Sequence, residues 1–258
     1  MEIKLTNINY KYKNASFNSL SSINMIITKP SIIGITGSSG SGKTTLLGII
    51  SKVIKPINGN ISIQPDKIKM VPQNPLNTFT NKTVIEEITK LTNNKTKVHA
   101  IDSLKMVQLK ENYLYKNLFD LSTSEQKLIT IATVLAANPK IIAFDEPLKG
   151  LDTETKKYLI KLMKMMKYRY NKIVIIASND IEVLNMLCDT VYVLNDGKIV
   201  YNKDTYDVLS NEKLMQENKL KCPNTLEFSN LVKKLKKINL GKRNEINDLI
   251  KDIYRKAR

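Results

Sequence analysis

The sequence contains only two cysteines, Cys188 and Cys222, which lie far apart and show no C-x-x-C spacing. Neither a disulfide framework nor a zinc site is therefore expected. Long apolar runs are also missing, since no stretch approaches the roughly 20 residues that cross a bilayer. Residues 1–10 show no basic segment followed by an apolar one. We expect a cytosolic chain that contacts a membrane only through a partner.

Acidic residues are scarce relative to basic ones. The 258 residues include 41 lysines and arginines against 24 aspartates and glutamates, which gives a net charge of +17. Such a surplus suits a nucleic-acid binder or a protein held near anionic lipid headgroups. However, no basic motif with interleaved aromatic residues accompanies the charge. We therefore expect no dedicated nucleic-acid partner.

The hydrophobic residues, 42% of the chain, alternate between strand-like and helix-like patterns. This alternation favours an α/β fold with a mostly parallel core sheet. Antiparallel strands are expected at residues 3–12 and 23–28, on either side of a turn. Buried strands are expected over residues 31–36, 140–144, 172–178 and 190–194. Helices are expected over residues 45–54, 124–138, 152–170 and 180–187, with a helical insert at about 84–138.

A glycine-rich segment follows the expected strand at residues 31–36. The pattern G-x-x-x-x-G-K-[ST] is matched by Gly37, Ser38, Ser39, Gly40, Ser41, Gly42, Lys43 and Thr44, with Thr45 next. Such glycines let backbone N–H groups converge on phosphate oxygens at a helix N-terminus. Lys43 adds a point charge, and the Thr44 hydroxyl can ligate Mg²⁺. A turn used only for chain reversal needs neither residue, so we expect bound nucleotide phosphates here.

Two adjacent carboxylates end the expected strand at residues 140–144. The apolar run delivers Asp145 to the carboxyl edge of the sheet, where it can hold Mg²⁺, and Glu146 can polarise a water molecule. The alternative interpretation is a plain surface turn that ends in Pro147.

These motifs, in this order, resemble the ATP-binding subunit of ABC transporters over nearly the whole chain. The resemblance implies the ATP-hydrolysing cassette fold over residues 1–204, a helical extension over 205–258, and the cofactors ATP and Mg²⁺. Gln73 resembles the family's glutamine loop, which implies a contact to the metal or the attacking water and a link to the membrane partner. Tyr12 matches the aromatic residue that stacks on adenine, with a packing tyrosine as the alternative.

The Gln-Asn-Pro triplet at 73–75 and the tail segment 222–231 are similar to those of energy-coupling factor transporters, which import vitamins and metal ions. This similarity implies a place on the cytoplasmic face of the cell membrane. It also implies an integral membrane scaffold and a substrate-binding membrane protein as partners. The alternative within transport is an ATPase of another complex, such as an exporter.

The segment 121–125, Leu-Ser-Thr-Ser-Glu, stands where the family has its signature Leu-Ser-Gly-Gly-Gln or Glu. The resemblance implies that Ser122, Thr123, Ser124 and Glu125 cap the ATP held by a partner chain. Thr123 and Ser124 place a Cβ where glycine allows close approach and unusual φ and ψ angles. We therefore expect a looser cap or a shifted backbone.

A second departure is Asn179, which occupies the position of the family's switch histidine. Its amide can bond a γ-phosphate oxygen but carries no titratable proton. Asp152 resembles the residue that lines the dimer seam. A homodimer would have the two departures at both sites, so we expect a heterodimer with a second ATPase. The alternative is a subunit that uses ATP as dimer glue or as a sensor, with almost no hydrolysis.

The tail carries an apolar stripe formed by Phe228, Leu231, Val232, Leu235 and Ile238. The resemblance implies that this stripe packs on the main domain or on the partner ATPase. The neighbouring lysines, at 233, 234, 236 and 237, are expected to form its solvated face.

Overall fold

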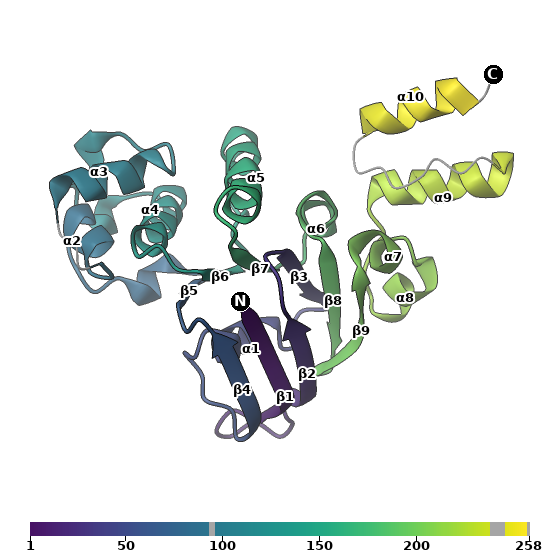
Figure 1. The fold of residues 1–258 in the computed structure, drawn as a ribbon, viewed down its shortest axis with the longest axis horizontal. Helices are drawn as coiled ribbons and strands as arrows, with labels where there is room; N and C mark the ends of the chain where they lie inside the picture. The colour runs from purple at the N-terminus through teal and green to yellow at the C-terminus, as the bar shows by residue number, and fades with distance from the viewer. Residues whose placement is uncertain (93–95, 238–245, 257–258) are drawn as a thin grey trace.

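The strands form two sheets in the computed structural model, which describes residues 1–92, 96–237 and 246–256 (Figure 1). The first sheet is antiparallel and has the order β2-β1-β4. Its strands are β1 (Glu2–Tyr10), β2 (Leu20–Ile27) and β4 (Asn58–Gln64). The expected pairing of the first two strands is therefore confirmed.

The second sheet has six strands in the order β5-β6-β7-β3-β8-β9. Its members are β3 (Ile32–Gly37), β5 (Ile68–Val71), β6 (Ile141–Asp145), β7 (Ile173–Ala177), β8 (Thr190–Asn195) and β9 (Lys198–Asp204). All neighbours are parallel except β8 and β9. Every residue of β3, β6 and β7 is buried, which explains their continuous apolar runs. The predicted α/β class with a mostly parallel core is confirmed.

Ten α-helices occur in the described residues. They are α1 (Lys43–Ile50), α2 (Val84–Thr89), α3 (Lys97–Lys105), α4 (Thr123–Ala136), α5 (Thr153–Tyr168), α6 (Ile181–Leu187), α7 (Thr205–Leu209), α8 (Glu212–Glu217), α9 (Asn224–Lys236) and α10 (Ile246–Lys256). Short 3-10 turns lie at η1 (Pro75–Thr78), η2 (Glu111–Tyr113) and η3 (Leu118–Asp120). None of these helices is long and apolar enough to cross a membrane.

Two hydrophobic cores lie on opposite faces of the six-stranded sheet. One packs α1 between the two sheets, with Leu46 and Ile50 in the same cluster as Leu5 and Ile35. The other packs α4, α5 and α6 against the opposite face, as Figure 1 shows, and extends into α2 and α3. This arrangement places the start of α1 at the carboxyl edge of β3, where the glycine-rich segment lies.

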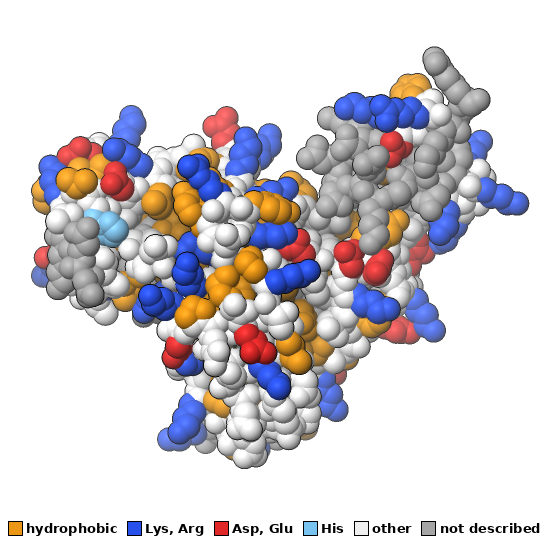
Figure 2. All heavy atoms as spheres, in the orientation of Figure 1, with side chains coloured by type: hydrophobic (Ala, Val, Ile, Leu, Met, Phe, Trp, Pro, Cys, Tyr) orange, Lys and Arg blue, Asp and Glu red, His pale blue; other side chains and the backbone are white. Residues whose placement is uncertain are grey.

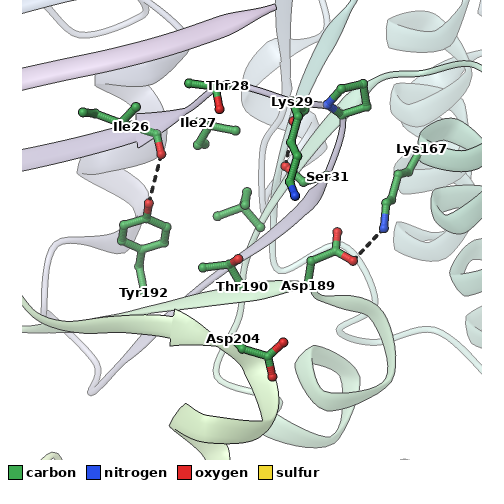
Figure 3. A pocket seen from close by; sticks show the side chains of 12 residues that line it. Ile26, Ile27, Thr28, Lys29, Ser31, Lys167, Asp189, Thr190, Tyr192 and Asp204 are labelled. Atoms are coloured by element: carbon green, nitrogen blue, oxygen red, sulfur yellow. Dashed lines mark hydrogen bonds and ion pairs between the residues drawn. The ribbon is translucent and has the colours of Figure 1, made fainter.

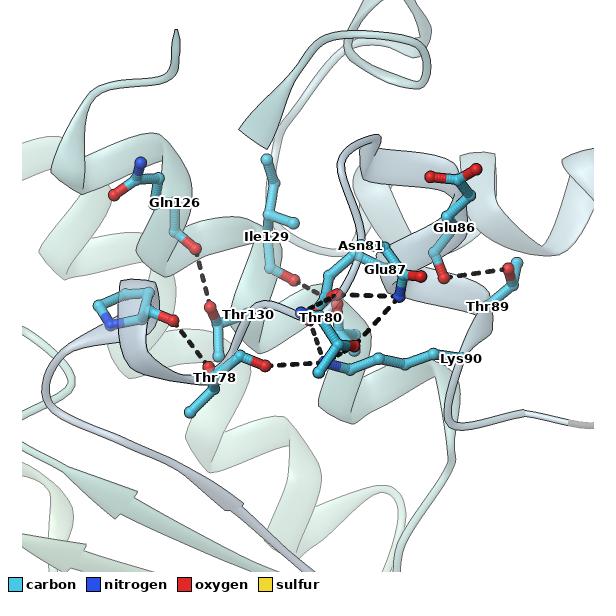
Figure 4. A network of polar contacts seen from close by, with 12 residues as sticks. Thr78, Thr80, Asn81, Glu86, Glu87, Thr89, Lys90, Gln126, Ile129 and Thr130 are labelled. Carbon is cyan, nitrogen blue, oxygen red and sulfur yellow. Dashed lines mark hydrogen bonds and ion pairs between the residues drawn. The ribbon is translucent and has the colours of Figure 1, made fainter. Parts of the chain in front are cut away.

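The helical region 84–136 is held together partly by a buried carboxylate (Figure 4). Glu87 of α2 pairs with Lys90 and accepts a hydrogen bond from Nδ2 of Asn81 at 3.2 Å. Lys90 in turn donates to the carbonyl of Thr78 at 3.0 Å. These bonds tie α2 to the segment that follows Gln73. His99 is half-buried, and its Nε2 lies 3.1 Å from the Ala136 carbonyl oxygen.

A cavity of about 510 Å³ lies at the amino end of β3, where the two sheets approach each other (Figure 3). The Lys167 ammonium pairs with Asp189 at 2.6 Å, and the second Asp189 oxygen accepts the Ile32 N–H at 2.7 Å. The Tyr192 hydroxyl donates to the Ile26 carbonyl at 3.4 Å. Because β3 ends at the glycine-rich segment, this cavity lies at the opposite end of the strand. It marks the place where the two sheets meet.

The tail is anchored at the start of α9. The Asn224 N–H donates to Glu182 of α6 at 2.7 Å, and Leu226 is fully buried. The predicted apolar stripe does not pack on the main domain: Phe228 is 44% exposed and Leu231 48%. Leu235 is 78% exposed, Val232 is half-buried, and Ile238 lies outside the described residues. The buried residues of α9, which are Thr225, Leu226 and Ser229, thus lie outside the predicted stripe.

Lysine and arginine side chains are scattered over the visible face of the molecule, across the helical region, the core and the tail (Figure 2). The lysines of α9 at positions 233, 234 and 236, and its C-cap Lys237, are all exposed, as expected for a solvated face.

Candidate functional site

A cavity of about 340 Å³ opens where β3 ends and α1 begins. It brings together residues from separate parts of the chain, including most of the predicted site. The lining residues are Tyr12, Ser19, Ser39, Gly40, Gly42, Lys43, Thr44, Thr45, Gln73, Asp145, Glu146, Lys149 and Asn179. Of the other predicted phosphate-loop residues, Gly37 and Ser38 line a neighbouring groove, and Ser41 is buried.

The glycines of this loop leave room for a ligand. Gly42 is the N-cap of α1 and has φ of +104°, and a Cβ there would lie 2.6 Å from the Ser19 carbonyl oxygen. Gly40 has φ of +82°, and a Cβ there would meet no described atom within 4 Å. Glycine is therefore required by backbone conformation at both positions. The unfilled space beside Gly40, next to the first N–H groups of α1, fits a phosphate group.

Lys43 lies folded across the loop. Its ammonium donates to the carbonyl oxygens of Gly37 at 2.9 Å and Ser38 at 3.0 Å. Burial lowers the pKa of Lys43, and the carboxylates of Glu146 and Asp145 oppose this shift. The two carbonyl oxygens thus hold the Lys43 side chain at the cavity.

Thr44 and Asp145 meet at the floor of the cavity. The Thr44 hydroxyl donates to Oδ2 of Asp145 at 2.8 Å, and Asp145 is only 2% exposed. Burial raises the pKa of Asp145, while the bond from Thr44 opposes the rise. A hydroxyl and a carboxylate are oxygen ligands of the kind that Mg²⁺ prefers, and the exposed Gln73 lines the same cavity. The chemistry of these oxygen atoms therefore fits a magnesium ion.

Glu146 begins a tight turn at the edge of the cavity. Its φ is +46°, and its N–H donates to the Ala177 carbonyl at 2.9 Å. The carboxylate accepts hydrogen bonds from the Ser178 hydroxyl and from the backbone N–H of Asn179, each at 2.8 Å. The Asn179 residue is exposed and lines the cavity beside Glu146. The sequence offered no signal for Ser178 beyond its position next to Asn179.

Tyr12 lies at the rim of the same cavity. Its hydroxyl is 3.1 Å from Oγ1 of Thr45, and its ring contacts that of Tyr10 edge-on. The residue as a whole is 44% exposed. An aromatic ring so placed can stack on a planar base, and that role stays a prediction.

The signature segment lies outside this cavity, since none of its residues is among the described residues that line it. Ser122 is the N-cap of α4 and forms a capping box with Glu125. A hydrogen bond from the Tyr113 hydroxyl, followed by one from Ser122, lowers the pKa of Glu125. Thr123 and Ser124 lie in the first turn of α4 and are not among the residues with positive φ. Both residues thus have helical backbone, and the expected looser cap or shifted backbone stays a prediction.

A buried lysine that the sequence did not reveal connects α4 to the carboxylate turn. Lys127 donates to the carbonyl oxygens of Glu146 at 3.1 Å and Lys149 at 2.8 Å. Burial lowers the pKa of Lys127. From sequence alone, an isolated lysine in an amphipathic helix is expected to face solvent. Only the packing in the structure shows that Lys127 is buried.

Asp152 is the N-cap of α5. Its Oδ1 accepts the N–H groups of Glu154 and Thr155, both at 2.9 Å. The hydrogen bond from the Thr155 hydroxyl is the main cause that lowers the pKa of Asp152. This cap accounts for the residue within the chain, and a role at a dimer seam stays a prediction.

Comparison with known proteins places this geometry in a family. The family model for ABC transporters matches residues 20–149. The energy-coupling factor transporter ATP-binding protein EcfA1 of Oenococcus oeni is 31% identical over 239 residues, 86% of this chain and 86% of that protein. The protein of the same name from Mycoplasma mobile is 29% identical over 90% of each chain.

Solved structures agree with the sequence relatives. A dimeric ATP-binding cassette bound to ADP and phosphate superposes with a TM-score of 0.73 at 27% identity, covering 79% of this chain and 98% of that one. The cbiO1 protein of Clostridium perfringens, part of the ABC transporter complex cbiONQ, has a TM-score of 0.68 at 26% identity, covering 88% and 97%. With its phosphate loop and carboxylate pair in one cavity, the chain belongs to the ABC transporter family and is an ATP-binding ATPase subunit.

Proposed function

We propose that this chain hydrolyses ATP to energise a membrane importer of the energy-coupling factor type, which takes up a vitamin or a metal ion. The observation that carries the proposal is the junction of Thr44 with Asp145, next to Glu146, at the mouth of the phosphate loop. Relatives that match almost the full length of the chain carry the energy-coupling factor name. The chain would act at the cytoplasmic face of the cell membrane.

Each part of the cavity has a role in this proposal. The backbone of residues 37–44 and the Lys43 ammonium hold the phosphates of ATP, and the ring of Tyr12 supports the base. Thr44, Asp145 and Gln73 would hold Mg²⁺, which would neutralise charge on the phosphates. Glu146 orients the attacking water from the edge of the cavity.

The second half of each ATP site would come from another chain. Ser122, Thr123, Ser124 and Glu125 lie outside the cavity that Lys43 and Glu146 share, which supports a role in capping the nucleotide of a partner. Asn179 removes an imidazole from the chain's own site. With a different ATPase as partner, each composite site would carry only one departure. We therefore propose a heterodimer.

The membrane partners would dock beside Gln73. The bonds from Asn81 to Glu87 and from Lys90 to the Thr78 carbonyl tie the segment after Gln73 to α2 (Figure 4). An integral membrane scaffold, joined to a substrate-binding membrane protein, would dock on α2. A movement of α2 would thus be transmitted to the ATP cavity. The exposed face of Phe228 and Leu231 in the extension, residues 205–258, would contact the partner ATPase.

A second function is favoured by one observation. Asn179 lies in the cavity and has no imidazole to protonate. A chain of this kind would bind ATP to hold the dimer together or to sense nucleotide, and would hydrolyse it rarely. Nucleotide affinity and turnover measured side by side in the assembled complex separate this function from a working ATPase.

The test uses a Glu146→Gln variant in the complex purified from membranes through a tag on this chain. We expect ATP binding to persist and hydrolysis at this chain's site to fall by at least tenfold, with Glu154→Gln, an exposed carboxylate of α5, as the matched control. Co-purification of a second ATPase and of small integral membrane proteins supports the importer. A chain that purifies as a homodimer with rapid turnover contradicts the heterodimer, and unchanged hydrolysis in Glu146→Gln contradicts the role of Glu146.

A further inference from the structure

Both carboxylate oxygens of Glu146 are held by one short segment that follows β7. The Ser178 hydroxyl donates to Oε2 at 2.8 Å, and the Asn179 backbone N–H donates to Oε1 at 2.8 Å. The Asp180 N–H donates to Oγ of Ser178 at 3.0 Å. Ser178 therefore accepts one hydrogen bond from the backbone and commits its single hydroxyl proton to Glu146.

The frame around this contact is rigid. Ser178 is 3% exposed, and its N–H donates to the Ile35 carbonyl of β3 at 3.0 Å. The Glu146 N–H donates to Ala177 at 2.9 Å, and β6 and β7 are paired in parallel up to Asp145 and Ala177. Donor and acceptor are thus each fixed to the central sheet, so the side-chain bond sets the direction of the carboxylate.

The side chain of Asn179 takes no part in this contact, because its bond to Glu146 comes from the backbone. Substitution at position 179 leaves that N–H in place. The hydroxyl of Ser178 is therefore the side-chain group that orients Glu146.

We infer that Ser178 is a positioning residue for Glu146, holding the carboxylate at the edge of the phosphate cavity, where it can orient the attacking water. The inference rests on the proposed role of Glu146 in hydrolysis. A displacement of about 1 Å at a reacting group can cost about a hundredfold in rate. The free energy lost with a hydrogen bond to a charged group corresponds to a factor of about ten or more in rate, if the bond acts in the transition state.

The experiment follows hydrolysis at this chain's own site. The complex is purified from membranes through a tag on this chain and incubated with a photoreactive ATP analogue, Mg²⁺ and vanadate, which retains the nucleotide product at a site that has hydrolysed it. Labelling of this chain is separated from that of its partner by mass. Binding is measured by labelling in the cold without vanadate. The variants are Ser178→Ala, Ser178→Thr, Asn179→Ala and Glu146→Gln.

We expect Ser178→Ala to lower the maximal trapping rate by about tenfold or more, with the half-saturating ATP concentration changed by less than about twofold. Ser178→Thr keeps a hydroxyl and should retain most of the rate. In an Asn179→Ala background, Ser178→Ala should cause the same fold loss, because the Asn179 side chain takes no part in holding Glu146.

Two different failures can be told apart. A wild-type chain that traps no nucleotide, or a Glu146→Gln variant that traps it normally, overturns the proposed function. If Glu146→Gln blocks trapping while Ser178→Ala matches the wild type, only the positioning role is overturned. The positioning role is also overturned if Ser178→Ala weakens binding as much as trapping, or if Ser178→Thr fails to restore the rate.

Discussion

The Ser124 hydroxyl donates a hydrogen bond to the Gly150 carbonyl at 3.2 Å. Ser124 lies in the first turn of α4, and Gly150 lies in the turn that follows β6 and Glu146. One turn further along α4, Lys127 binds two carbonyls of the same turn. A glycine at position 124 could not make this bond. Ser124, which departs from the family signature, thus connects two functional segments. One is the segment proposed to cap a partner's ATP, and the other is the turn that carries Glu146 in this chain.

Replacement of Ser124 by glycine should lower the free energy of unfolding by about 1–2 kcal/mol. The change removes a hydrogen bond and adds backbone freedom within a helix. Ser124→Ala removes the same bond but keeps a helix-favouring side chain, so it should cost less. Urea unfolding of the three proteins, followed by circular dichroism, measures the difference. Equal stability of all three would show that the contact with Gly150 contributes nothing.

Replacement of Lys127 by methionine should destabilise the fold by about 1–3 kcal/mol. Methionine fills the space but leaves the carbonyls of Glu146 and Lys149 without a buried donor. Lys127→Ala should cost more, since it also leaves a cavity. Lys161→Met, at an exposed position of α5, is the matched control and should change stability by less than about 0.5 kcal/mol. A Lys127→Met protein as stable as this control contradicts the prediction.

Glu125 should make stability depend on pH in the acidic range. Its pKa is lowered from 4.5, chiefly by the hydrogen bond from Tyr113, so the folded state favours the ionised carboxylate. This stabilisation is fully present above pH 4.5 and is lost as pH falls through the lower pKa of the folded state. The melting temperature of the wild type should therefore converge on that of Glu125→Gln as pH drops below 4.5.

Tyr113→Phe is a second control for this titration, because it removes the main hydrogen bond to Glu125 but keeps the ring. Its acid-induced loss of stability should be smaller than that of the wild type. A gap between wild type and Glu125→Gln that stays constant across the acidic range would mean that the carboxylate is not stabilised by folding.

Tyr12→Ala should weaken binding of MgATP by about 1–3 kcal/mol, because it removes a ring that can stack on the base. Tyr12→Phe keeps the ring and loses only the contact with Thr45, so its affinity should stay near that of the wild type. Isothermal titration of the complex measures both, with the exposed Tyr115→Ala as the control. Wild-type affinity in Tyr12→Ala would favour the packing tyrosine instead.

The sequence predicted the elements whose signal is local. The phosphate loop was recognisable because strand, glycines, lysine and helix all lie within residues 32–50, and the structure builds them in that order. The buried strands β3, β6, β7 and β8 were recognisable because burial on both faces requires a continuous apolar run. The edge strands β4 and β9 were missed, since most of their residues are exposed and carry little hydrophobic pattern.

The tail shows a different limit of sequence patterns. Four residues of its predicted apolar stripe, Phe228, Leu231, Val232 and Leu235, lie in α9. Leu226, outside the stripe, is nevertheless the residue that is fully buried, while Phe228 and Leu231 remain exposed. A periodic pattern shows which residues share a face. It does not show what covers that face.

The sequence by itself determined that a phosphate-binding loop and a pair of carboxylates exist, because each depends on backbone conformation and residue type within one short segment. Only the tertiary structure decided how they meet. Thr44 contacts Asp145 across 101 residues, and Ser178 contacts Glu146 across 32. The strand order β6-β7-β3 sets both contacts, since parallel pairing brings the carboxyl ends of these strands to one edge of the sheet.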